Sequence, residues 1–191
     1  MSPMVLSPLS PDTSYRPGEI SITPWSPQSL GIAGLIASAG SVPAVAAWPA
    51  AGLVIYMPFA VPEPMVATKL FYGIGAAAGN VDMGIYNEAG TLLVSIGSTG
   101  ASGSSTLQVL DITDTLLGRG RYYLALVADT VTTLTIYKAA PAAGVCQALG
   151  LLQQASVTLP LSSNASPATF AKYAQAYIPY CGVQGYRTVG P

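Results

Sequence analysis

The sequence predicts an all-β protein, an antiparallel β-sandwich of the jelly-roll type with about seven or eight strands. Short runs rich in β-branched and aromatic residues follow one another from about residue 50 onward, separated by turn-forming residues. Seven prolines fall within the first 48 residues, where they disfavour helices and central strands. A chain of 191 residues can hold one well-buried domain and an extension. We therefore expect an extended proline-rich arm over residues 1–48 and a sandwich domain over residues 49–191.

Seven runs have the length and composition of strands. They are LVIYMPFA (53–60), MVATKLFYGI (65–74), VDMGIYN (81–87), LLVSI (92–96), STLQVLDI (105–112), RYYLALVA (121–128) and VTTLTIY (131–137). Alternation of apolar and polar residues predicts the side chains that face the core. These are Val81, Met83, Ile85, Leu92, Val94, Ile96, Leu107, Val109, Tyr122, Leu124, Leu126, Ala128, Leu134 and Ile136. Pro58 suggests an edge or a bulge, and residues 87–90 form a turn between two strands.

The chain is less regular after residue 138. The run AGVCQALGLLQQ (143–154) fits either a short helix or part of a loop. In SPATFAKYAQAY (166–177), a serine precedes a proline, which predicts one or two helical turns. AYIPYCGVQGY (176–186) is expected to return to the sheet as a closing strand.

Composition limits the partners. Only 8% of the residues are charged, the net charge is −1, and 51% of the residues are hydrophobic. A near-neutral chain lacks the basic surface that nucleic-acid binding requires. So little charge is unusual for a free monomer, and we expect other protein chains to cover much of the surface.

The uncharged region before residue 62 allows three interpretations. Residues 30–48 have about the length of a membrane span. However, the run is mostly Ala, Gly and Ser, Pro43 interrupts it, and no Lys/Arg cluster orients it. An extended arm lying on neighbouring subunits is favoured over a membrane span and over a loop that covers its own domain. The apolar anchors of this partner-binding arm are predicted to be Ile20, Ile22, Trp25, Leu30 and Leu35.

The sequence contains few residues that could act in catalysis or bind a metal. It contains no histidine, so the common general base is missing. Asp111 and Asp114 are the one close carboxylate pair, and we expect them to make turn hydrogen bonds, with a calcium site as the alternative. The two cysteines, Cys146 and Cys181, are predicted to be buried free thiols, although one bridge is the alternative. We predict no catalytic residues, no metal, no cofactor and no enzymatic activity.

Tyrosine is the remaining candidate for recognition, with eleven copies. Tyr72, Tyr86 and Tyr137 are predicted on outward strand faces, where they could contact proteins or stack on sugars. The alternative for each is a ring packed at the sheet margin with its hydroxyl group in water.

Two segments resemble a known family. VDMGIYNEAGTLL (81–93) and LLGRGRYYLALVADT (116–130) resemble jelly-roll modules of tailed-bacteriophage virion proteins, which carry a G-I-Y-[ND]-x-x-G turn and a G-x-Y-Y-L-A-L strand. AYIPYCGVQ (176–184) is similar to their short IP-x-x-G ends, so the resemblance spans roughly residues 53–183. The proline-rich arm lies outside it.

The resemblance implies a structural part of a virion that is assembled in the host cytoplasm. Such a protein decorates or cements the capsid, contacts other virion proteins such as the major capsid protein, and often forms a homotrimer. The alternative that it leaves open is a carbohydrate-binding or receptor-binding module of a tail or fibre.

Overall fold

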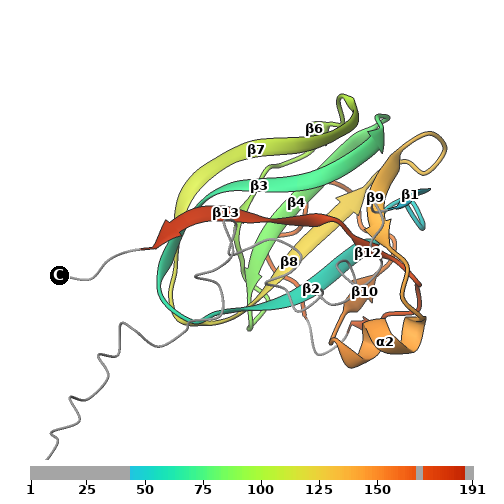
Figure 1. Cartoon of the computed structure of the whole chain (residues 1–191). Coiled ribbons are helices and arrows are strands. Elements are labelled where there is room, and N and C mark those ends of the chain that lie inside the picture. Colours follow the sequence, from blue (N-terminus) through green and yellow to red (C-terminus); the bar gives the residue numbers. More distant parts are fainter. Residues whose placement is uncertain (1–43, 167–169, 188–191) are drawn as a thin grey trace, which may run out of the picture.

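The structure of the protein is a computed structural model that describes residues 44–166 and 170–187. It is an all-β sandwich of two antiparallel sheets (Figure 1). Sheet A contains β1 (Ala44–Ala47), β9 (Thr135–Ala139), β3 (Met65–Ala76), β13 (Cys181–Arg187), β7 (Ser104–Leu117) and β12 (Ile178–Pro179). Sheet B contains β11 (Ala171–Lys172), β10 (Leu152–Gln154), β2 (Val54–Val61), β8 (Gly120–Ala128), β4 (Asn80–Asn87), β5 (Leu92–Ser95) and β6 (Thr99–Gly100). The helix α2 (Ala143–Ala148) lies at one end of the sandwich.

The predicted sandwich is confirmed, and each of the seven predicted runs contains or overlaps a strand. The last of these strands, β9, begins only at Thr135, so residues 131–134 of the predicted run lie outside it. The turn at residues 87–90 is also confirmed: the Gly90 N–H donates to the Asn87 carbonyl at 3.0 Å, and Gly90 has a φ of 89°. Pro58 is accommodated because β10 pairs only with residues 54–56 of β2, so no strand of the described residues pairs with that side of Pro58. The main core lies between the sheets and contains the expected inward residues of β4, β8 and β9.

The predicted facing of β7 is wrong. Leu107 and Val109 were expected to face the core but are 48% and 50% exposed, whereas Leu110 and Ile112 pack against the core. Both alternating sets of this strand contain apolar side chains, so polarity alone does not select the inward set. The predicted facing of Leu92 is also wrong. A bulge shifts the register between β4 and β5, and Leu92 packs on the outer side of sheet B.

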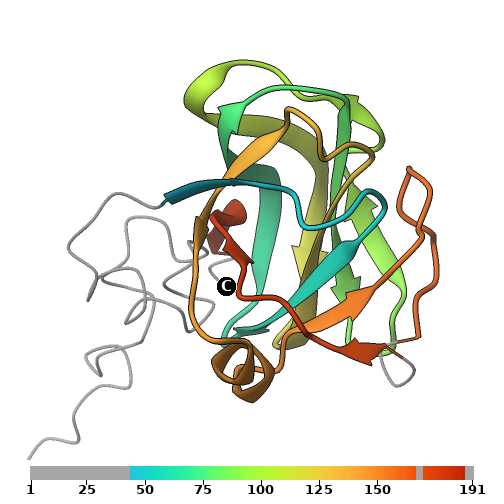
Figure 2. The ribbon, with the colours of Figure 1, turned by 90° about the vertical axis from the view of Figure 1, so that its right-hand side faces the viewer.

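A covering segment buries the outer face of sheet B. Residues 155–166, which we call the strap, have almost no regular structure and run along the right-hand side of the sandwich in Figure 2. Beneath the strap lies a second apolar cluster that includes Val54, Tyr56, Tyr86, Val127 and the strap residue Leu161. Strand β4 is therefore buried on both faces, although its alternating sequence predicted one face in water.

The sandwich begins earlier than the predicted boundary at residue 49. Strand β1 pairs with β9, and Trp48 is 1% exposed within the core. The Trp48 indole N–H donates to the Leu53 carbonyl at 3.0 Å, and its ring meets the edge of Tyr177 at 5.6 Å. Residues 44–48 thus belong to the sandwich. The predicted arm anchors Ile20, Ile22, Trp25, Leu30 and Leu35 lie outside the described residues.

The C-terminal region differs from the prediction in two respects. Residues 152–154 belong to the run that was expected to be a helix or a loop, but they form β10. Residues 170–177 of the expected helix contain β11 and an extended stretch instead. The extended backbone buries Tyr173 and Tyr177 in the core, where the Tyr173 hydroxyl donates to the Tyr177 carbonyl. The short helix at residues 143–148 and the closing strand at residues 181–187 are confirmed.

Trp48→Ala tests whether this residue belongs to the core. Because the substitution removes a fully buried ring and its hydrogen bond, we expect the free energy of unfolding to fall by about 3–5 kcal/mol. Val45→Ala, at a side chain that is 50% exposed, should cost less than about 1 kcal/mol. Denaturant titration of both variants measures the difference. Equal small losses would show that Trp48 does not anchor the fold.

The two cysteines provide a second test. Both are free and buried, and burial raises the pKa of both thiols. Since only the thiolate reacts readily, we expect neither thiol to react with a water-soluble disulfide reagent in the native protein. Both should react after unfolding in denaturant. Rapid modification of native protein, followed by mass spectrometry, would contradict this packing.

Candidate interaction surface

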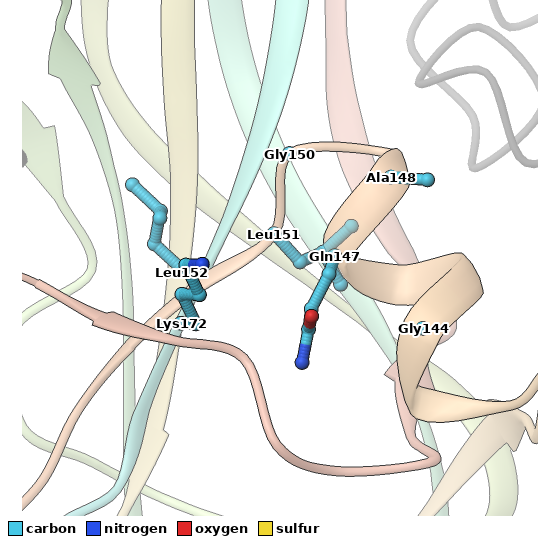
Figure 3. Close-up of a pocket in the computed structure, with 7 residues that line it drawn as sticks. All are labelled: Gly144, Gln147, Ala148, Gly150, Leu151, Leu152 and Lys172. Carbon is cyan, nitrogen blue, oxygen red and sulfur yellow. The ribbon is translucent and has the colours of Figure 1, made fainter.

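The hollow beside α2 carries no catalytic set (Figure 3). It has a volume of about 380 Å³, and Lys172 is the charged residue of its lining. The Gln147 amide donates to the Tyr173 carbonyl at 2.9 Å, so it serves the fold. The lining residues are Gly144, Gln147, Ala148, Gly150, Leu151, Leu152 and Lys172. This hollow is lined by no Ser, Thr, Cys, Asp or Glu side chain.

A second hollow of about 560 Å³ lies where the strap begins, and it includes Asn80 and Asp129. The Asp129 carboxylate accepts hydrogen bonds from the backbone N–H of Asn80 at 2.8 Å and from its side-chain amide at 3.0 Å. Gly79, at a φ of 63°, leaves room for this contact, since a Cβ there would collide with Asp129. Asp129 therefore fixes the junction of β4 and β8.

The expected turn at Asp111 and Asp114 is wrong, because β7 continues to Leu117. Asp111 forms an ion pair with Lys69 on the neighbouring strand β3. No group of three potential metal ligands occurs within residues 44–166 and 170–187. This part of the chain therefore contains no ligand cluster that would support the alternative of a calcium site.

Two of the three tyrosines predicted for surface recognition are buried. Tyr72 and Tyr86 are each 1% exposed. Tyr72 points into the main core, and burial raises its pKa to about 12. Tyr86 lies under the strap, where its hydroxyl donates to the Ser162 carbonyl at 2.7 Å and burial raises its pKa to about 12. Of the three, Tyr137 alone is partly exposed.

Most of the strongly exposed large hydrophobic side chains of the described residues lie on the outer face of sheet A. Seven large hydrophobic residues are strongly exposed within the described chain, and five of them belong to β1, β7 and β13. These five are Val45 (50%), Leu107 (48%), Val109 (50%), Leu116 (64%) and Tyr186 (56%). The other two, Leu93 and Val145, lie on β5 and α2. These five residues lie on the outer face of sheet A, which we call the A face.

Strand pairing arranges the A face in rows. Tyr186, Val66 and Leu116 lie opposite one another on β13, β3 and β7. Phe71 of β3 lies opposite Val109 of β7.

At one end of the A face, Tyr137 and Tyr180 lie over Gly73, where a Cβ would come within 3.0–3.3 Å of their atoms. The ion pair between Lys69 and Asp111 lies between these rows. Because the two charges are opposite, the pair adds no net charge to the A face.

The edge of the A face is also unpaired. Within the described residues β7 pairs only with β3, so its far edge presents free backbone N–H and C=O groups. Lys and Pro residues often protect such edges, but β7 contains neither. A neutral apolar face beside a free strand edge can bind another protein through side-chain burial, backbone pairing or both.

Sequence reasoning missed most of this surface. Leu116 follows an irregularity in the β3–β7 pairing, and Tyr186 follows another between β3 and β13. Simple alternation does not carry across these points. The low charge content was the available signal, and it indicates a covered surface without locating it.

The described residues contain no helix that is long and apolar enough to cross a membrane. Comparisons with family models, with curated proteins and with solved structures find no match for this chain.

Proposed function

We propose that the protein is a non-enzymatic structural component of a phage virion. It decorates or cements the capsid through a jelly-roll domain and an arm formed by its first residues. The observation that carries the proposal is the A face, on which five of the strongly exposed apolar side chains gather. A particle component can keep such a face buried against a neighbour, for which the major capsid protein is the proposed partner.

The resembling motifs support the fold part of the proposal. The G-I-Y turn motif forms β4 and the turn after it, and the G-x-Y-Y-L-A-L motif forms β8, its neighbour in sheet B. Most of these side chains are buried in one of the two apolar clusters. They serve packing, so the partner contact is assigned to sheet A.

We propose further that the protein forms a homotrimer. The unpaired edge of β7 favours association, since pairing or covering it removes free backbone groups from water. A head-to-tail contact between copies closes into a ring when the rotation is suitable. Sedimentation equilibrium at several protein concentrations tests this, with a mass of three chains expected. A monomer that persists at the highest concentration would contradict the trimer.

Val109→Asp tests the A face as the capsid-binding surface. A carboxylate at this position places a charge in the centre of the proposed contact, and we expect at least about a tenfold loss of affinity. The matched control is Val145→Asp on α2, because Val145 is also exposed, at 41%, but lies off the A face. Co-sedimentation with capsids assembled without this protein measures binding. Equal binding by both variants would contradict the proposed surface.

A deletion that tests the arm must leave the sandwich intact. Removing residues 1–43 keeps β1 and Trp48, whereas removing residues 1–48 also deletes a core side chain. We expect the shorter deletion to weaken capsid binding while the thermal unfolding temperature changes little. Unchanged capsid binding after this deletion would show that the arm has no anchoring role.

The second candidate is a carbohydrate-binding or receptor-binding module of a tail or fibre. The adjacent, partly exposed rings of Tyr137 and Tyr180 on the A face favour it. It predicts binding on a glycan array that Tyr137→Ala abolishes. No signal for any host polysaccharide would eliminate this candidate.

A further inference from the structure

Asp82 is the one charged or polar residue among the buried side chains of the described chain, and it lies beneath the strap. It is 0% exposed, and it sits on β4 opposite Val127 of β8. Its Oδ2 accepts a hydrogen bond from the Leu161 backbone N–H of the strap at 2.7 Å. Its Oδ1 has no hydrogen-bond partner of normal geometry. A carboxyl group is therefore enclosed by a loop that satisfies only one of its two oxygens.

The strap is held by few other polar contacts. At its start, the Val157 N–H donates to the Gly52 carbonyl at 2.9 Å. At its end, the Ala165 N–H donates to the Gly90 carbonyl at 2.7 Å, and the Ser163 carbonyl accepts from the Leu92 N–H at 2.9 Å. Between these ends the strap is attached at Asp82, at the Tyr86 hydroxyl and through the buried side chain of Leu161.

No charged partner compensates an ionised Asp82. Burial raises the pKa of the carboxyl group. The hydrogen bond from Leu161 and the nearby donor groups of Met83, Ser95 and Gly97, which form no hydrogen bond of normal geometry to Oδ1, act in the opposite direction. Tyr86 of the same strand is the titratable group that interacts with it, and the phenol stays neutral because its own pKa is raised to about 12. None of the groups that shift the Asp82 pKa is a cationic side chain of the described chain.

We propose that Asp82 makes the strap a pH-sensitive cover, which closes over a neutral carboxyl group and loosens when that group ionises. A loosened strap exposes the aromatic and aliphatic cluster on the outer face of sheet B, including Tyr56 and Val54. The strap is a loop attached near each end, so it can open while both sheets stay paired. This inference does not depend on the proposed virion role.

The direction of the effect follows from proton linkage. The folded-state pKa of Asp82 is raised above the ordinary value of about 3.9, so the closed strap retains a proton that the open strap releases. The stabilisation is fully present below the ordinary pKa. It is lost as the pH rises through the raised pKa. Between these two pKa values the equilibrium constant for opening increases by up to tenfold per pH unit, and above the raised pKa it no longer changes, because the carboxyl group is then ionised in both states.

Hydrogen exchange of the whole chain tests the proposal. The protection factor of the Leu161 amide, corrected for intrinsic exchange, is measured between about pH 4 and pH 8, on either side of the range into which a buried carboxyl group shifts. In the wild type we expect this protection to fall by up to tenfold per pH unit between the ordinary pKa of about 3.9 and the raised pKa, and then to level off. Asp82→Asn keeps a side-chain acceptor but cannot ionise, so its protection should not change with pH. The control Asp114→Asn, at an exposed residue of β7, should behave as the wild type.

Flat protection in the wild type would overturn the proposal, as would an Asp82→Asn variant that keeps the pH dependence. If Asp82→Asn fails to fold, the ¹³C chemical shift of the Asp82 carboxyl group in the wild type gives its pKa directly. An ionisation near the ordinary value of about 3.9 would also overturn the proposal.

Discussion

The burial of sheet B on both faces is the constraint on which the rest of the structure depends. Strands β2, β4 and β8 direct one set of side chains into the main core and the other set under the strap. A sheet covered on both faces needs apolar residues on both, and this raises the hydrophobic fraction of the chain. The strap supplies this second cover within the chain itself. Within the described residues, sheet A has no equivalent cover, so its outer face carries most of the strongly exposed apolar side chains.

The positions of the strands could be predicted because their signals are local. β-Branched and aromatic runs, and a turn that requires a positive φ at Gly90, act over a few residues. The faces could be predicted only where one side of a strand meets water. In β4 the alternation of Val81, Met83 and Ile85 with Asp82 and Tyr86 describes polarity correctly. It contains no information about the strap, which lies some seventy residues later in the chain and has no periodicity of its own.

The sequence predicts that a covered apolar surface exists, but it does not predict which residues form that surface. The low charge content indicates a covered surface, and the structure locates exposed apolar residues on sheet A. Bulges next to Leu116 and Tyr186 change the facing of these strands, and bulges depend on pairing partners. The boundary at residue 49 failed for a related reason. Prolines before residue 48 suggested a separate arm, but the burial of Trp48 depends on Tyr177, which is distant in sequence.

The strap over sheet B and the partner that we propose for the A face differ in how easily each is removed. Burial of one leucine side chain such as Leu161 contributes about 1.5–3 kcal/mol. Each pH unit between the ordinary pKa and the raised pKa of a buried carboxyl group costs the closed state about 1.4 kcal/mol. A change of one or two pH units at Asp82 therefore offsets the apolar contact that holds the middle of the strap. Among the described residues, the A face carries no buried carboxyl group. The partner that we propose for this face would be held by apolar contacts, which do not titrate and which suit a permanent contact.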